Sequence, residues 1–236
     1  MKKRIIRVLK IIAFLIVALI GLLIVYSINP YKASDDMKDY IVEDSNVDYY
    51  EDFNQITYEH EDAIANIIII PGGKVKAEAY KYMASRLAQM HYKVTIYKPL
   101  LNLSILTGKS ADQFIDPNME NIIIGHSLGG VTASMIASDN TNIDYLILLG
   151  SYSTVDISSV SVLLITAEND LILNQENFEK SKVFLPDDYV EYEIIGGNHG
   201  QFGWYGNQNK DGEASIDVKE QQDTIISQIL HFIEPS

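Results

Sequence analysis

The residues Gly125-x-Ser127-x-Gly129 have the types and spacing that can turn a serine into a nucleophile. They follow a short β-branched run, 121–124, and precede a run of small residues typical of a helix, 130–138. A Gly-x-Ser-x-Gly sequence between a strand and a helix predicts a sharp turn that exposes the serine hydroxyl. Glycines are needed because the turn brings their backbones close together. The alternative is an ordinary strand-to-helix turn in which Ser127 only caps the helix.

A serine hydroxyl needs a base that accepts its proton and a carboxylate that orients this base. With a turn of this kind, the expected chain order is serine, then acid, then histidine. Asp170 follows the apolar run 162–166, and His199 follows the run 190–195. Because the carboxyl ends of parallel strands meet at one edge of a sheet, these side chains should lie near Ser127. We predict Ser127 as the nucleophile, His199 as the base and Asp170 as the acid.

Other acidic and histidine residues compete for these roles. Glu168 is the nearest competitor of Asp170, but it lies closer to the strand and should point elsewhere. His126 is adjacent to the serine, and neighbouring side chains of an extended chain point to opposite faces, so we expect it to pack beside the site. The remaining histidines fall in or beside surface loops or in the last helix: His60, His91 and His231.

A tetrahedral intermediate needs two N–H donors aimed at its oxygen. One is expected to be the backbone N–H of Leu128, directly after the nucleophile, and the other should come from the loop after an earlier strand, 71–74. Gly73 is the first choice in this loop and Lys74 the second. The alternative is a glycine turn that only links the strand to the next helix.

Three aromatic residues follow the histidine: Phe202, Trp204 and Tyr205. Their position predicts that they line a substrate pocket beside His199, and the alternative is that they pack locally. No metal ion or organic cofactor is expected, since hydroxyl, imidazole and carboxylate groups complete this chemistry.

The elements that must position these residues alternate from about residue 47 onward. Near-continuous apolar runs are typical of parallel strands covered on both faces, and apolar residues at every third or fourth position are typical of helices. The alternation predicts an α/β fold with a doubly wound, mostly parallel sheet and helices on both faces. Only residues 151–161 separate two of the strands, too few for a helical lid. Strands are expected at 49–53, 55–59, 65–70, 93–97, 121–124, 145–149, 162–166 and 190–195, and helices at 77–90, 110–114, 129–137, 174–181 and 218–233.

The first residues of the chain predict a contact with a membrane. A basic cluster, 2–10, precedes an apolar run, 11–26, close to the lower length limit of a spanning helix. Basic residues before the run and acidic ones after it predict that the remainder lies outside the membrane. We expect a signal anchor or transmembrane helix at 1–28, an acidic extracytoplasmic tether at 29–46 and a catalytic domain at 47–236. The alternative is a cleaved leader and a secreted domain.

Composition excludes several classes of function. The net charge of −14 leaves no basic face for phosphates, so nucleic acid is not expected as a partner. The chain has no cysteine, which excludes thiol catalysis, disulfides and cysteine-ligated zinc.

The motifs together resemble a known family. The chain is similar to α/β-hydrolases, and to their small, lidless bacterial branch related to dienelactone hydrolases, at 71–75, 125–130 and 196–206. The resemblance implies a triad of Ser127, Asp170 and His199 with an oxyanion hole near Gly73 and Leu128. Dienelactone hydrolases use a cysteine nucleophile, which this chain lacks, so their substrate does not carry over.

The expected function is that of a serine hydrolase, carboxylesterase-like, which cleaves an ester-like bond of a small-molecule or envelope-derived acyl substrate through an acyl-enzyme. Two alternatives remain open: acyl transfer to a cell-envelope acceptor, and a catalytically silent binding module at the cell surface.

Overall fold

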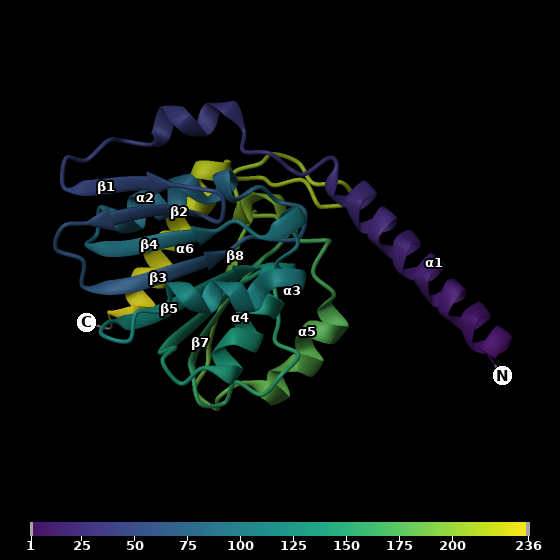
Figure 1. Ribbon diagram of the computed structural model, residues 1–236. Coiled ribbons are helices and arrows are strands. Elements are labelled where there is room, and N and C mark those ends of the chain that lie inside the picture. The colour runs from purple at the N-terminus through teal and green to yellow at the C-terminus, as the bar shows by residue number, and fades with distance from the viewer. Residues whose placement is uncertain (1, 235–236) are drawn as a thin grey trace.

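The computed structural model describes residues 2–234, and eight strands within them form one sheet (Figure 1). The strand order is β1-β2-β4-β3-β5-β6-β7-β8. Strand β2 runs antiparallel to β1 and β4, and the other neighbours are parallel. The mostly parallel sheet expected from the sequence is therefore confirmed. The strands are β1 (Val47–Glu51), β2 (Gln55–His60), β3 (Ala65–Ile70), β4 (Tyr92–Tyr97), β5 (Glu120–His126), β6 (Tyr145–Leu149), β7 (Ser161–Ala167) and β8 (Val190–Ile194).

Helices cover both faces of the sheet. Helices α2 (Lys81–Ala88) and α6 (Val218–Ile233) pack on one face, and α4 (Leu128–Asp139) and α5 (Gln175–Ser181) on the other (Figure 1). The side chains of β3 alternate between the two cores, and every residue of this strand is buried. This alternation explains why the run reads as continuously apolar, since each face needs its own apolar side chains.

Shorter helices connect these elements. The expected helix 77–90 begins as the 3₁₀ turn η2 (Ala77–Tyr80) before it continues as α2. After β4 the chain forms η3 (Leu100–Asn102), α3 (Ser104–Thr107) and η4 (Gly108–Phe114). Two further 3₁₀ turns are η5 (Lys182–Phe184) and η6 (Gly200–Phe202). Between β6 and β7, residues 150–160 form no helix, so no helical lid lies there.

The chain begins with helix α1 (Lys2–Ser27), which projects away from the domain (Figure 1). Its segment Arg4–Ser27 is long and apolar enough to cross a membrane and is not buried against the rest of the chain. The expected N-terminal spanning helix is therefore present as a candidate membrane span.

The segment 29–46, expected to be an acidic tether, is partly folded onto the domain. Residues 35–40 form the 3₁₀ helix η1 (Asp35–Tyr40), and Met37 in it is buried in the core. The N–H of Ser34 donates to the carbonyl of Trp204 over 2.9 Å. The folded unit thus begins before residue 47, because aromatic and backbone groups of the domain hold this segment in place.

Candidate active site

Ser127 lies at the sharp turn between β5 and α4, in a conformation that L-residues rarely adopt (φ 53°, ψ −123°). The flanking glycines make this turn possible. A Cβ atom on Gly125 would lie 2.4 Å from the Cα of Gly130, and one on Gly129 would lie 2.3 Å from the carbonyl oxygen of Ile70. Side chains at both positions are excluded by backbone atoms, and the backbone strain is localised at the serine.

Asp170 and His199 form a buried pair at the ends of β7 and β8. The Nδ1 atom of His199 lies 2.7 Å from Oδ2 of Asp170, and the two residues are 1% and 5% exposed. The other carboxylate oxygen of Asp170 accepts hydrogen bonds from the N–H groups of Ile172 and Leu173, each over 2.8 Å. These bonds fix the carboxylate so that its free oxygen faces the imidazole, which then carries its proton on Nδ1.

The loop that carries His199 is held from outside the site. The side chain of Gln221, on α6, accepts from the N–H of Asn198 and donates to its carbonyl. Asp211 accepts from the N–H of Gly200 over 2.8 Å. Glu168, the competing acid, accepts from the N–H of Gly196 and so points away from the imidazole, as expected. The histidine is therefore positioned by side chains from three distant segments.

Ser127 and His199 both line one cavity of about 220 Å³. The Nε2 atom of His199 is buried and has no hydrogen-bond partner among the described residues, and no bond joins it to the Ser127 hydroxyl. In ligand-free sites this contact is often long and tightens when substrate binds. The remaining lining residues are mostly apolar: Leu128, Val131, Gly150, Ser151, Tyr152, Ile172, Leu173 and Asn174.

Among the described residues, the loop after β3 has a single backbone N–H that is not already hydrogen-bonded. The N–H of Gly72 donates to the hydroxyl of Tyr80 over 2.9 Å, and the N–H of Lys74 donates to the carbonyl of Asn102 over 2.7 Å. Proline at position 71 has no N–H, so within this loop, in the described part of the chain, Gly73 alone keeps a free donor. The second choice for this donor, Lys74, is wrong because its backbone N–H already donates to Asn102.

Gly73 also lies against the residue that follows the nucleophile. A Cβ atom added to Gly73 would lie 3.0 Å from Cδ2 of Leu128. The N–H of Leu128 belongs to the first turn of α4, where backbone donors have no partner within the helix. The two expected oxyanion donors therefore come from adjoining segments.

His126 packs behind the site, as its position beside the serine suggested. Its Nδ1 lies 2.8 Å from the hydroxyl of Tyr80, and its ring centroid lies 4.7 Å from that of His199. Burial is the main reason why the pKa of His126 lies well below its ordinary value, and the charge of His199 lowers this pKa further. The Tyr80 hydroxyl accepts from the N–H of Gly72 and also bonds to Nδ1 of His126, and these two bonds tie the loop of Gly73 to the core.

None of the three aromatic residues expected to contact substrate lines the cavity of Ser127, although the ring of Phe202 packs edge-on against His199. Phe202, Trp204 and Tyr205 are all buried in the core cluster that contains α2 and α6. Trp204 packs edge-on against Tyr82 and also against Tyr40 of the docked N-terminal segment. The structure corrects this expectation, because the sequence shows that a loop is aromatic but not which way its side chains turn.

Two residues near the site were not identified from the sequence. Gly150 follows β6 with φ 50°, and a Cβ atom there would lie 3.0 Å from both Asp170 and His199. A glycine directly after an apolar strand was the available signal for it. Tyr80 was assigned only to an amphipathic helix, and nothing in the local pattern distinguishes it from an ordinary core tyrosine.

A group that could hold a metal ion lies away from this site. Ligand atoms of His60, Asp62 and His91 lie within 4.8 Å of one another at the edge of the sheet where β3 and β4 begin. The N–H of Asp62 donates to Nδ1 of His60, which gives that histidine a part in the turn. The group lies at the opposite edge of the sheet from the carboxyl ends of the strands, where Ser127 lies.

Comparisons with known proteins identify the family of the chain and support its fold. The model of the alpha/beta hydrolase family matches residues 66–223, more than half of the chain. The chain therefore belongs to the alpha/beta hydrolase family. Among solved structures it is similar to a predicted CIB-like hydrolase from Thermoplasma acidophilum, with a TM-score of 0.56 and 11% identity, over 78% of this chain and 98% of that one. No curated protein matches the sequence. The narrower relation to dienelactone hydrolases stays a prediction.

Proposed function

We propose that this hydrolase is a membrane-anchored serine esterase that uses Ser127, His199 and Asp170. The observation that supports it most is the combination of a strained serine at a strand-to-helix turn with a buried Asp170–His199 pair on the same cavity. Strain and burial of charge are both unfavourable, and they are concentrated where the family places its chemistry.

In the proposed reaction, Nε2 of His199 accepts the proton of the Ser127 hydroxyl as its oxygen attacks an ester carbonyl. The N–H groups of Gly73 and Leu128 stabilise the oxyanion, each worth about 3–4 kcal/mol of barrier. Asp170 keeps the proton of the imidazole on Nδ1 and stabilises the imidazolium. The imidazolium then protonates the departing alcohol, and water releases the acyl group by the same path.

We also propose that α1 is an uncleaved anchor and that the domain lies on the extracytoplasmic side. Support comes from the basic residues near the start of α1, from its length and from the docking of the chain that follows it onto the domain. Neither a metal ion nor nucleic acid enters the proposed activity.

The proposal is tested by kinetics on a short, activated ester with the full-length protein in detergent. Ser127→Ala is expected to lower kcat by about 10⁴-fold or more. Ser151→Ala is the matched control, since this hydroxyl lines the same cavity but donates to the carbonyl of Ser127, and it should keep most of the turnover. Equal rates for Ser127→Ala and the unaltered protein would refute the mechanism.

A further inference from the structure

The end of helix α1 is held against the loop that carries Gly73. The ammonium of Lys74 lies 5.2 Å from the ring centroid of Tyr26, in the last turn of α1. Tyrosines at the ends of membrane-spanning helices sit at the headgroup level. Lys74 is the next residue after Gly73, and adjacent Cα atoms are about 3.8 Å apart. The candidate oxyanion donor is thus close to the expected membrane surface.

The connection between α1 and the domain is short and fixed. Tyr31 pairs in parallel with Val75; its N–H donates to the carbonyl of Lys74 over 2.8 Å, and its carbonyl accepts from Lys76 over 2.9 Å. Only residues 28–30 lie between Ser27 and this pairing, and the four Cα–Cα steps from Ser27 to Tyr31 span at most about 14 Å. The domain therefore cannot move far from the membrane in which α1 would lie.

The same docked segment is fixed further along. The ring of Tyr31 packs on Tyr205, with centroids 5.3 Å apart, and the indole N–H of Trp204 donates to Asp36 over 3.3 Å. These contacts hold the segment on the loop that follows His199. Both sides of the candidate site, the oxyanion loop and the histidine loop, are thus tied to the chain that emerges from α1.

Large apolar side chains are exposed around this edge. Phe53 is 89% exposed at the β1–β2 turn, beside the end of β4, and Leu171 is 71% exposed next to Asp170. Leu100 and Phe53 line a groove of about 560 Å³, and Leu106 of α3 is also exposed. These four residues, the apolar rim, lie where the strands end in their carboxyl direction.

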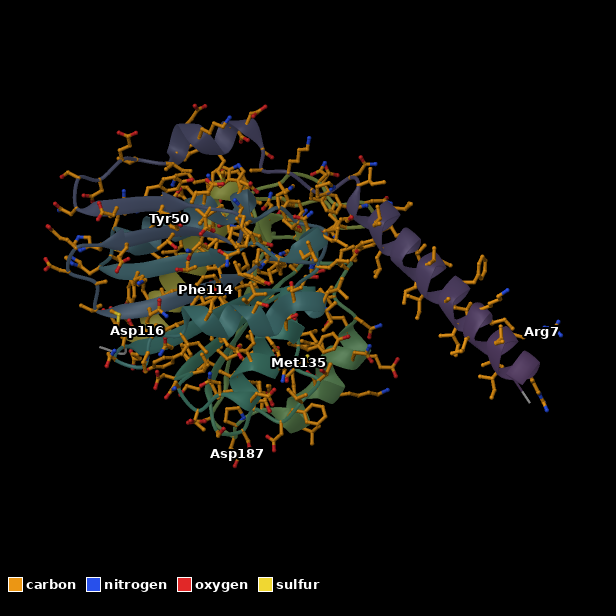
Figure 2. All side chains as sticks on the ribbon, viewed as in Figure 1. Arg7, Tyr50, Phe114, Asp116, Met135 and Asp187 are labelled. Atoms are coloured by element: carbon orange, nitrogen blue, oxygen red, sulfur yellow. The ribbon has the colours of Figure 1, made fainter. Side chains whose placement is uncertain are left out.

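The opposite edge of the sheet faces away from α1. Asp116, which precedes β5, lies on the side of the domain remote from the helix, while Arg7 marks the far end of α1 (Figure 2). The exposed Ile64, directly before β3, lies at that amino edge. The carboxyl edge therefore carries the helix, the apolar rim and the candidate site together.

We infer that the carboxyl edge rests on the outer surface of the bilayer and that the substrate is an acyl ester of an amphiphile held in that leaflet. This inference rests on the proposed function. The cavity of about 220 Å³ is smaller than the usual pocket for a drug-sized ligand, so a long acyl chain has to extend outside it. At this edge the chain would stay in the bilayer beside the apolar rim.

The reaction on such a substrate balances without a further reagent. The Ser127 oxygen forms a bond to the ester carbonyl carbon. The bond between this carbon and the oxygen of the lipid alcohol then breaks, and the alcohol oxygen takes the proton from His199. Water then supplies a hydroxyl to the acyl carbon and a proton to Ser127. The products are one fatty acid and the lipid alcohol.

The test uses the full-length protein reconstituted into phosphatidylglycerol vesicles that contain a diacylglycerol, with a water-soluble short ester as the second substrate. The double variant Phe53→Asp/Leu106→Asp places charges on the rim, and Ile64→Asp is the control at the amino edge. The rim variant should lower fatty-acid release about tenfold, with hydrolysis of the soluble ester unchanged. The control should change neither rate.

A flexible linker inserted between Ile28 and Asn29 supplies a second variant, since it keeps the anchor but removes the fixed geometry. It should also lower fatty-acid release and leave the soluble ester rate intact. Turnover of the soluble ester without turnover of diacylglycerol, or equal effects of the rim and control variants, overturns the inference and leaves the esterase standing. Absence of Ser127-dependent turnover of either substrate overturns the esterase, and the inference with it.

Discussion

The two edges of the sheet both bring ionisable side chains together, but they do so in different surroundings. At the carboxyl edge, Asp170 and His199 are buried and bonded beside the strained Ser127. At the amino edge, His60 and His91 have ring centroids 4.0 Å apart, yet His91 is exposed to solvent. Both edges thus bring ionisable groups close together, but only at the carboxyl edge is the pair buried beside a strained serine.

The two edges also differ in how many residues have a strained backbone conformation. Sparsely populated backbone conformations cost of order 1–3 kcal/mol each. Lys74, Leu101 and Asn102 all have positive φ at the carboxyl edge, in the segments joined by the bond from Lys74 to Asn102. At the amino edge His91 also has positive φ, so strained residues occur at both edges but gather at the carboxyl edge. Such strain persists only when surrounding contacts hold it, and here it surrounds the proposed oxyanion loop.

The largest effect is expected from the histidines. His199→Gln should lower kcat for a small activated ester by about 10⁴-fold or more, because the proposed base is lost. His91→Gln, at the amino edge, should leave kcat within about twofold, a change typical of surface positions. Steady-state kinetics on both variants, with circular dichroism as a folding control, would contradict the account if the two lost activity equally.

A smaller effect is expected at the oxyanion loop. Gly73→Pro removes the proposed donor and should lower kcat by about 10²–10³-fold, with a smaller change in KM. Gly73→Ala keeps the N–H and adds only a Cβ atom 3.0 Å from the flexible side chain of Leu128, so its loss should be much smaller. Similar losses in the two variants would indicate that bulk at this position matters and not the donor.

The bond network behind the site should affect stability more than rate. Tyr80→Phe removes the hydroxyl that joins Gly72 to His126 and leaves two buried polar groups unpaired. We expect the free energy of unfolding to fall by about 1–3 kcal/mol. Denaturant unfolding followed by fluorescence of Trp204, the single tryptophan, measures this. An unchanged midpoint would show that the network does not hold the loop. Tyr82→Phe, whose hydroxyl contacts Asp223 at a partly exposed site, should cost less.

The smallest effect is a pH dependence from His126. Burial lowers its pKa in the folded protein, so below about pH 6.5 the unfolded chain takes up a proton that the folded chain does not. The free energy of unfolding should therefore fall on acidification, by at most about 1.4 kcal/mol per pH unit from this group. Below pH 6.5, the free energy of unfolding of His126→Phe should depend less on pH than that of the unaltered protein. His231 is exposed, so His231→Gln should keep the pH dependence of the unaltered protein. Equal slopes for His126→Phe and the unaltered protein would exclude this origin.

Local patterns made most of the fold predictable. The apolar runs of β3, β5, β6 and β7 are covered on both faces, so their sequences are distinctive and the alternation of strands and helices follows. The pairing of Asp170 with His199 could be predicted because chain order and strand ends constrain it. Glycines at 125 and 129 likewise follow from the geometry of the turn.

Other features depend on contacts between distant segments and were not predictable. The docking of residues 31–40 relies on Trp204 and Val75, and the docked segment itself is polar and has no periodicity. Whether an aromatic loop residue faces the core or a pocket depends on how the loop folds, which is why Trp204 was misplaced. The bond from Lys74 to Asn102 joins two loops, and neither sequence indicates the other.

The central claim is that Ser127 is an activated nucleophile, and covalent labelling tests it most directly. The protein is incubated with a fluorophosphonate, digested and analysed by peptide mass spectrometry. We expect a single phosphonylated peptide that contains Ser127, absent in Ser127→Ala and much slower to form in His199→Gln. An unmodified Ser127 in the folded protein, or labelling that continues at the same rate without His199, would contradict it.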